Sequence, residues 1–249
     1  MALLVAALPI AAAAASPFAN WAAVVVAGDY HSAHTEVATE AFDNARRDVT
    51  RALVTAGFDP KNIQQFSVRP QNYPNEKNLL PSDIGIIDNS LIQLAGQAKD
   101  GCLLYFSSHG AQSGVVVGWT GQQPNFLSPD TLSKMVDRAC GSRPTVVILS
   151  ACFSGVFVPT LSDPNHAVFT AARNDRSSFG CSENDHYPYY DDCILQSFPK
   201  VSDFAALASA AKQCVSDKEI ATGAKPPSEP QIAIGPGLRP DLPFYTFSK

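Results

Sequence analysis

The sequence lacks several features that mark common functional classes. It has no run of basic residues, and its formal net charge of −5 gives no electrostatic footprint for nucleic acid. No internal repeat points to a solenoid or a propeller. Its six cysteines include no C-x-x-C pair, and cysteine and histidine do not cluster at zinc-like spacing. Six cysteines among 249 residues are also too few for a disulfide scaffold. These absences argue against nucleic acid as a partner and against a structural metal.

The first 15 residues differ in composition from the rest of the chain. They are apolar or small throughout and end in a run of alanines, MALLVAALPIAAAAA. This pattern is typical of a signal peptide cut near Ala15, although no Lys or Arg precedes the apolar stretch. The alternatives are a mis-assigned start or a frayed helix. The segment is too short and too rich in alanine to be a membrane span. We therefore expect an exported protein, periplasmic or secreted, with no stable membrane span.

Strands and helices alternate along the remaining chain. With 45% apolar residues, the chain can bury one sizeable core. Six segments predict strands, most of them continuous apolar runs: residues 22–27, 63–68, 102–108, 146–149, 166–172 and 230–235. Residues 114–119 predict part of a hairpin, and apolar spacing predicts helices over 36–57, 88–98, 128–139 and from 203 onward. Such continuous apolar strands are typical of a mainly parallel sheet covered on both faces. The sequence therefore predicts the α/β class, in one domain over residues 21–249.

Two of these strands lead directly to chemically reactive side chains. The strand at 102–108 runs into His109 and Gly110, and the strand at 146–149 is followed by Cys152. Right-handed crossovers place successive parallel strands side by side, so we expect His109 and Cys152 at one edge of the sheet. An imidazole beside a thiol can generate a thiolate nucleophile and later protonate a leaving amine. Gly110 lets the backbone approach a substrate, so its N–H and that of Cys152 can hold an oxyanion.

The motifs around these residues resemble those of a known family. SSHG and SACFSG, about 40 residues apart, resemble the His-Gly and Ala-Cys motifs of clan CD cysteine peptidases, and most closely those of the legumain-like C13 family. TAARNDRSSFGC is similar to the stretch after the nucleophile strand in legumains, and SEPQIAIG resembles the closing strand of bacterial C13 members. The resemblance implies a caspase-like three-layer α/β/α sandwich with a mainly parallel central sheet. It also implies a cysteine peptidase with His109 and Cys152 as its catalytic dyad, and with no cofactor.

The sequence departs from legumains around the pocket for the P1 side chain. Legumains carry an acidic residue two positions before the nucleophile, where this chain has Ser150. They also place an arginine after the first strand, whereas this chain has none between Ala27 and Arg46. Ser178 and Asp192 match two other pocket positions by resemblance, so Ser150, Ser178 and Asp192 are the candidate substrate-binding residues. A pocket carboxylate without a fixed cation predicts that P1 Asp is the poorest substrate, and that Arg or Lys is accepted at least as well as Asn.

The other cysteines and histidines have structural or solvated interpretations. Cys102 lies inside a predicted strand and is expected to be a core thiol, whereas Cys140 has no assigned role. Cys181 follows the family motif and is interpreted as structural. Cys193 and Cys214 would close a disulfide in an oxidising compartment. Four histidines in polar loops are expected to be solvated: His31 and His34, whose loop should border the cleft, and His166 and His186.

Three functional hypotheses follow from the sequence. The first is an exported cysteine endopeptidase that acts on peptide or protein substrates through an acyl-enzyme intermediate. The second is a transpeptidase or transamidase with the same dyad, in which an amine rather than water accepts the acyl group. The third is a non-catalytic binding module with a caspase fold, against which the intact His109, Gly110 and Cys152 argue. The sequence does not determine the oligomeric state.

Overall fold

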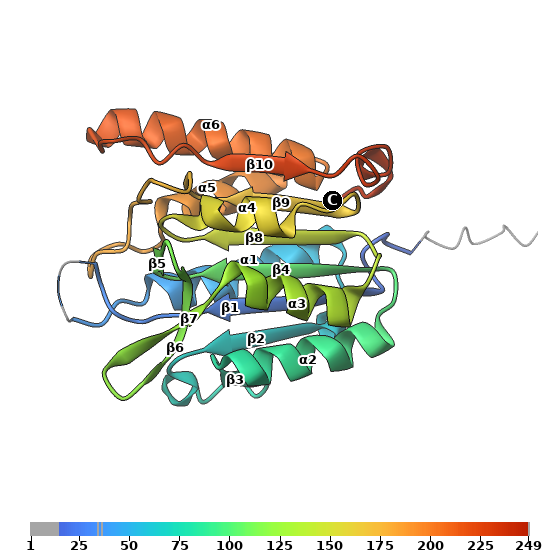
Figure 1. The fold of residues 1–249 in the computed structure, drawn as a ribbon, viewed down its shortest axis with the longest axis horizontal. Helices are drawn as coiled ribbons and strands as arrows, with labels where there is room; N and C mark the ends of the chain where they lie inside the picture. The colour runs from blue at the N-terminus through green and yellow to red at the C-terminus, as the bar shows by residue number, and fades with distance from the viewer. Residues whose placement is uncertain (1–14, 34, 36, 249) are drawn as a thin grey trace, which may run out of the picture.

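A seven-stranded sheet forms the centre of the protein, whose computed structural model describes residues 15–33, 35 and 37–248 (Figure 1). The strand order is β10-β9-β8-β4-β1-β2-β3, and every neighbouring pair is parallel except β10 with β9. The strands are β1 (Trp21–Ala27), β2 (Ile63–Ser67), β3 (Leu79–Pro81), β4 (Gly101–Ser107), β8 (Thr145–Ser150), β9 (His166–Thr170) and β10 (Gln231–Ile234). The six expected strands are confirmed with shifts of no more than two residues at their ends, and β3 is an addition.

Helices cover both faces of this sheet. The α-helices of the described chain are α1 (Ala41–Ala56), α2 (Ile84–Gln97), α3 (Pro129–Cys140), α4 (Val158–Leu161), α5 (Tyr189–Ser197) and α6 (Phe204–Thr222). Short 3₁₀ turns lie at Pro60–Asn62, Pro70–Asn72, Ser154–Phe157, Phe198–Lys200 and Leu242–Phe244. Residues of α1, α5 and α6 join one hydrophobic core, and residues of α2, α3 and α4 join a second. The two cores lie on opposite faces of the sheet, which confirms the expected three-layer α/β/α sandwich.

The first strand shows why the sheet is made of continuous apolar runs. Ala23 and Val25 of β1 pack in the core with α1, whereas Ala22, Val24 and Val26 pack in the core with α2. Every residue of β1 is buried, because both of its faces are covered. Burying one such aliphatic side chain contributes about 1.5–3 kcal/mol, so polar residues would be costly at either set of positions.

Two helices begin at different places from those expected. The helix expected over 36–57 starts only at Ala41, because the preceding loop folds back on itself through a bridge between His31 and Ala38. The helix expected from residue 88 starts at Ile84, because the Asp83 side chain caps it by accepting the N–H of Ile86 at 3.0 Å.

Helix α5 was not expected from the sequence. It follows Pro188 and carries Asp191 and Asp192 in its first turn, where carboxylates are favoured by the helix dipole. With nine residues and many polar ones, it shows little apolar periodicity for a sequence-based prediction to detect. This helix decides which of its two adjacent carboxylates faces the sheet.

A small antiparallel sheet stands at the carboxyl ends of the parallel strands (Figure 1). It consists of β5 (Gly110–Ala111), β6 (Gly114–Thr120) and β7 (Gln123–Leu127), which confirms the expected hairpin. The hairpin packs on the end of β1, where the N–H of Gly118 donates to the carbonyl of Gly28 at 2.9 Å. A Cβ on Gly28 would lie 2.1 Å from the carbonyl oxygen of Val116, so only glycine permits this approach.

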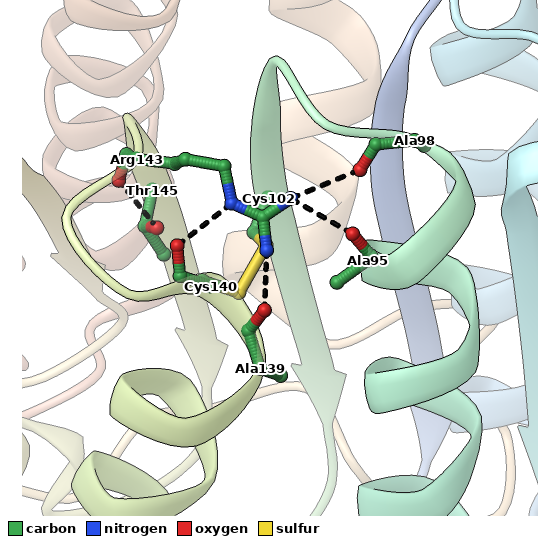
Figure 2. The surroundings of a disulfide bond; sticks show 7 residues. All are labelled: Ala95, Ala98, Cys102, Ala139, Cys140, Arg143 and Thr145. Atoms are coloured by element: carbon green, nitrogen blue, oxygen red, sulfur yellow. Dashed lines mark hydrogen bonds between the residues drawn. A yellow bond between two sulfur atoms is a disulfide. The ribbon is translucent and has the colours of Figure 1, made fainter.

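Two disulfides fasten helices to the fold. Cys102 is not a free core thiol, because it is bonded to Cys140 and so ties β4 to the end of α3 (Figure 2). The expectation for Cys102 was wrong because its partner lies 38 residues away in the sequence and becomes a neighbour only when α3 packs against β4. The structure also contains the expected bond between Cys193 and Cys214, which joins α5 to α6.

Arg143 binds the C-terminal ends of two helices beside the first disulfide (Figure 2). Its guanidinium donates to the carbonyls of Ala95 at 2.9 Å, Ala98 at 3.1 Å and Cys140 at 2.7 Å, and also to that of Ala139. The last carbonyls of a helix have no partner within the helix, and the helix dipole favours a cation there. One side chain therefore satisfies the ends of α2 and α3 together.

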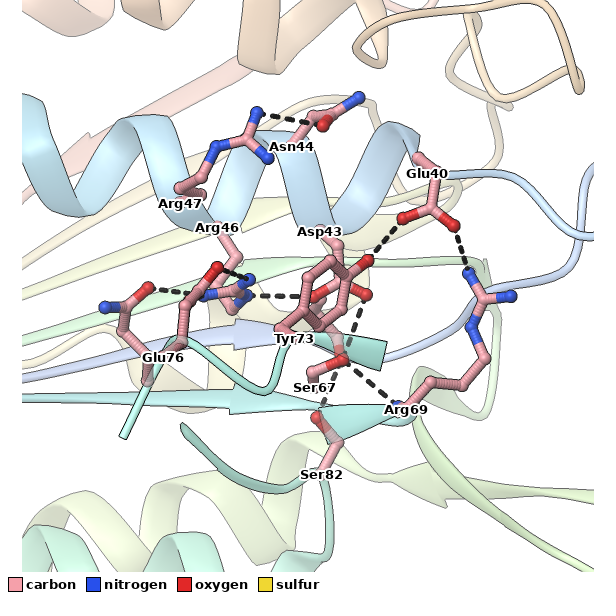
Figure 3. A network of polar contacts seen from close by, with 12 residues as sticks. Glu40, Asp43, Asn44, Arg46, Arg47, Ser67, Arg69, Tyr73, Glu76 and Ser82 are labelled. Carbon is pink, nitrogen blue, oxygen red and sulfur yellow. Dashed lines mark hydrogen bonds and ion pairs between the residues drawn. The ribbon is translucent and has the colours of Figure 1, made fainter. Parts of the chain in front are cut away.

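A buried polar network joins the first turns of α1 to β2 (Figure 3). Arg46 is fully buried and pairs with Asp43 at 2.9 Å and with Glu76 at 2.6 Å. Asp43 also accepts the hydroxyl of Ser67, at the end of β2, at 2.9 Å. Burial raises the pKa of Asp43, against the opposing effect of Arg46. Removing one partner would leave a buried charge unpaired, so this network fixes α1 on β2.

The bonding of the six cysteines gives a direct chemical prediction. We expect two reactive thiols in denatured, unreduced protein, from Cys152 and Cys181, and six after reduction. Each disulfide should stabilise the fold by about 3–4 kcal/mol through restriction of the unfolded chain, so reduction should lower the free energy of unfolding. Thiol titration with a chromogenic disulfide measures the count. Four thiols before reduction would mean that one of the two disulfides is absent, and peptide mapping of the labelled cysteines would show whether it is the bond of Cys102.

Candidate active site

His109 and Cys152 lie at the same edge of the sheet. They follow β4 and β8, which are neighbours, and Ser107 and Ser150 at the ends of these strands are paired in register. Each reactive residue therefore stands two positions beyond a paired serine. Both line a cleft of about 450 Å³. The structure thus brings together the two residues that the sequence analysis singled out.

The imidazole of His109 is oriented by a backbone carbonyl. Its Nε2 lies 2.9 Å from the carbonyl oxygen of His31. Because a carbonyl can only accept a hydrogen bond, Nε2 carries a proton and donates. The neutral tautomer then leaves Nδ1 as the basic nitrogen. The ring also packs edge-on against Phe42, with 5.0 Å between the ring centroids.

The loop that provides this carbonyl is held by Asp29. The buried carboxylate accepts the backbone N–H groups of Tyr30 at 2.7 Å and His31 at 3.1 Å. The same oxygen lies 2.8 Å from Nδ1 of His31 and accepts the indole N–H of Trp119 at 2.9 Å. The expectation that His31 is solvated was therefore wrong, because its ring is engaged by Asp29 and lies between aromatic neighbours. His34 lies outside the described residues.

Cys152 is a half-buried free thiol in a tight turn. Its Sγ accepts the backbone N–H of Ser178 at 3.2 Å and lies 3.5 Å from the Ser178 hydroxyl. Within the part of the chain that the structure describes, the backbone N–H of Cys152 donates no hydrogen bond. The next residue, Phe153, has a left-handed φ of 56°, and its N–H donates to the carbonyl of Arg176 at 2.8 Å. A bulky residue in this conformation costs about 1–3 kcal/mol, a cost that is typical of functional turns.

Gly110 packs directly against the backbone of Cys152. A Cβ at this position would lie 2.2 Å from the carbonyl oxygen of Cys152, so no other residue fits without a shift of the backbone. The close approach places the Gly110 backbone against that of Cys152, which lines the cleft. It is compatible with the oxyanion role expected for Gly110.

Of the three candidate substrate-binding residues, only Ser178 lines the cleft. Ser150 is the last residue of β8 and is buried, with its hydroxyl directed to Asp191 at 2.6 Å. Asp192 is not among the residues that line the cleft, and its carboxylate pairs with Lys218 on α6. The expectation of an unpaired carboxylate at Asp192 was therefore wrong, because α5 turns this side chain toward α6.

The cleft contains residues that the sequence analysis did not identify. Its lining includes Phe179, Asp185 and Tyr189, and also the exposed Lys225. Asp185 accepts the N–H of Ser182 at 2.8 Å, which shapes this wall as a turn. Nothing in the local sequence distinguishes Asp185 from an ordinary acidic turn residue.

Cys181 is a second free thiol on the wall of the cleft. Burial raises its pKa to about 12, and the nearby Cys152, Asp185 and Asp29 add to this rise. The thiol of Cys181 therefore stays protonated near neutral pH and is a poor nucleophile. This agrees with the structural interpretation of Cys181.

Comparison with known proteins identifies the family. The family model of the peptidase C13 family matches residues 82–214, which is more than half of the chain and includes both His109 and Cys152. The protein belongs to the peptidase C13 family. It is a cysteine-type peptidase, and its substrates are proteins or peptides. No curated protein matches its sequence.

A solved structure supports the fold independently of the sequence. The crystal structure of caspase-1 from Spodoptera frugiperda superposes with a TM-score of 0.60 at 14% sequence identity, covering 93% of this chain and 94% of the caspase chain. At this identity the likeness shows the fold alone, which is caspase-like. Within the described residues of this C13 peptidase, no helix is long and apolar enough to cross a membrane. That part of the chain also brings no three potential ligand side chains together as a metal site.

Proposed function

We propose that this C13 peptidase hydrolyses peptide bonds through a catalytic dyad of His109 and Cys152. The observation that carries the proposal is their common position: each lies two residues beyond the end of one of two adjacent parallel strands, and both line one cleft. The carbonyl of His31 fixes the imidazole with Nε2 as donor, which leaves Nδ1 free to act as the base.

The reaction then proceeds in two stages. Nδ1 of His109 takes the proton of the Cys152 thiol, and Sγ attacks the carbonyl carbon of the substrate. The resulting oxyanion is stabilised by the backbone N–H of Cys152, which has no partner among the described residues, and by that of Gly110. The imidazolium protonates the leaving amine as the C–N bond breaks, which gives an acyl-enzyme. His109 next removes a proton from water, hydroxide attacks the thioester, and the acid product and free thiol are released.

Asp185 is the charged group that we assign to recognition of the P1 side chain. Its carboxylate lines the cleft with the nucleophile, whereas Asp192 is paired outside it. Among the described residues that line the cleft, the only other charged one is Lys225, which is exposed, so solvent screens its charge. A cleft lined by a carboxylate favours a cationic P1 residue and disfavours aspartate.

The two disulfides support export of the protein. Such bonds persist in oxidising compartments and are rare in the cytosol. We therefore propose that residues 1–15 are removed and that residues 21–249 form the peptidase domain of a periplasmic or secreted protein. All but the last residue of the leader lies outside the described residues.

The dyad predicts the effects of two substitutions. Cys152→Ala should abolish peptide hydrolysis, because no other side chain replaces the nucleophile. His109→Ala should lower kcat by about 10²–10⁴-fold through loss of the general base. Steady-state hydrolysis of a fluorogenic peptide measures both effects, with circular dichroism as the control for folding. Turnover at the wild-type rate in Cys152→Ala would refute the mechanism.

The cleft charge predicts the P1 preference. We expect cleavage after Arg or Lys to be at least as efficient as after Asn, and cleavage after Asp to be the weakest. Asp185→Asn should reduce kcat/KM most for basic P1 residues, by about tenfold or more for loss of a charge-assisted contact. A positional-scanning peptide library measures the profile. If Asp192→Asn changes it and Asp185→Asn does not, the assignment of the P1 carboxylate is wrong.

Export predicts a shortened mature chain. Protein recovered from its native host should begin near Ser16, because the alanine-rich segment ends there. Intact-mass analysis combined with N-terminal peptide mapping measures this directly. A mature form that retains Met1 to Ala15 would contradict the proposed export.

A further inference from the structure

A single buried carboxylate contacts both strands that lead to the dyad. Asp191, on α5, is completely buried. Its Oδ2 accepts the hydroxyl of Ser107, on β4, at 2.9 Å and the hydroxyl of Ser150, on β8, at 2.6 Å. Its Oδ1 accepts the phenol of Tyr105, also on β4, at 2.5 Å. Asp191 therefore joins α5 to the ends of two adjacent strands.

The two serines occupy equivalent places in the two strands. Ser107 and Ser150 are paired in register across the sheet, and each stands two residues before His109 or Cys152. Because both hydroxyls bind the same oxygen, a movement of one strand along the other would break one of these bonds. The contact thus fixes the relative position of the segments that carry the base and the nucleophile.

Asp191 also anchors the helix that provides one of the lining residues of the cleft. It follows Tyr189, which lines the cleft, after only one intervening residue. Helix α5 is itself tied to α6 by the Cys193–Cys214 bond. The carboxylate therefore connects a firmly held helix, the substrate-facing wall and both catalytic strands.

The ionised carboxylate is costly at this place. Burial raises the pKa of Asp191 to about 6, although the hydroxyls of Ser150, Tyr105 and Ser107 oppose the rise. The titratable groups that face it are the phenols of Tyr105 on β4 and Tyr190 on α5, and none of its described contacts is a cation. Since the folded-state pKa lies above the unfolded one, this group destabilises the fold as the pH rises from about 4 to about 6. Such a cost is expected where a residue serves function.

We propose that Asp191 is a positioning residue, which sets the distance between His109 and Cys152 by holding Ser107 and Ser150 on one carboxylate oxygen. This proposal rests on the dyad mechanism above. Asp191 acts through the two strands and does not touch the substrate. A displacement of about 1 Å between reacting groups can cost about 10²-fold in rate, which is the scale of effect that such a residue controls.

The test is the isosteric variant Asp191→Asn, compared with wild type in steady-state peptide hydrolysis. A carboxamide keeps the volume but offers only one acceptor oxygen, so it cannot accept from Tyr105 and both serines together. We expect kcat to fall by about 10–100-fold while KM stays within about twofold, because the substrate-facing side chains remain. In wild type, Asp191 lowers the free energy of unfolding as the pH rises from about 4 to about 6. This decrease should be absent in Asp191→Asn.

Asp43→Asn is the matched control for general loss of stability. Asp43 is another buried carboxylate that accepts a serine hydroxyl at the end of a strand, but β2 carries no dyad residue (Figure 3). This variant should be less stable and keep kcat within about twofold of wild type. An equal loss of kcat in both variants would overturn the proposal, because the effect would then follow stability alone.

Ser150→Ala keeps the test decisive if Asp191→Asn does not fold. It removes one hydrogen bond to the shared oxygen, so kcat should fall as it does in Asp191→Asn. The double variant should show little further loss of kcat, because both changes break the same contact. The positioning role would be overturned if both single variants kept the wild-type kcat. If Asp191→Asn fails to fold, a wild-type kcat in Ser150→Ala alone would overturn it. That outcome would leave the dyad intact, whereas turnover in Cys152→Ala would refute the dyad itself.

Discussion

The parallel pairing of β4 with β8 is the constraint on which the rest of the site depends. Residues from Cys102 to Ser107 pair one for one with residues from Thr145 to Ser150. A shift of this register by one residue would turn every side chain of the moved strand to the opposite face. Both faces of the sheet are packed against helices, so the apolar side chains of the two strands resist such a shift. His109 and Cys152 stay together because they are only two residues away from this pairing.

Contacts on several sides restrict the two residues beyond the strands. The backbone of Ser108 donates to the carbonyl of Ser150 at 3.1 Å, and Gly110 packs on the carbonyl of Cys152. The loop after β1 adds the carbonyl of His31, which is itself held through Asp29. These contacts account for the fixed tautomer of His109 and, within the described residues, for a backbone N–H at Cys152 that donates no hydrogen bond. The proposed catalysis needs this preorganisation more than it needs any single strong interaction.

The sequence predicts the parts of this arrangement that depend on local patterns. The apolar strands, and with them the edge position of His109 and Cys152, follow from runs of a few residues. Such local patterns do not distinguish the roles of Asp191 and Asp192. Adjacent helical residues differ by about 100° in direction, and only the packing of α5 selects the one that faces the sheet. The bond between Cys102 and Cys140 and the contact of the His31 carbonyl with His109 likewise depend on tertiary packing. A backbone acceptor has no residue type by which a sequence could reveal it.

The central claim is that His109 activates Cys152, and selective alkylation of the native protein tests it most directly. Iodoacetamide labelling at neutral pH, followed by peptide mass spectrometry, compares the rates at Cys152 and Cys181 in one sample. The account predicts that Cys152 reacts about tenfold faster or more, because the pKa of Cys181 is raised to about 12. His109→Ala should slow labelling of Cys152 and leave that of Cys181 unchanged. Equal rates at the two thiols, or a rate at Cys152 that does not depend on His109, would contradict the account.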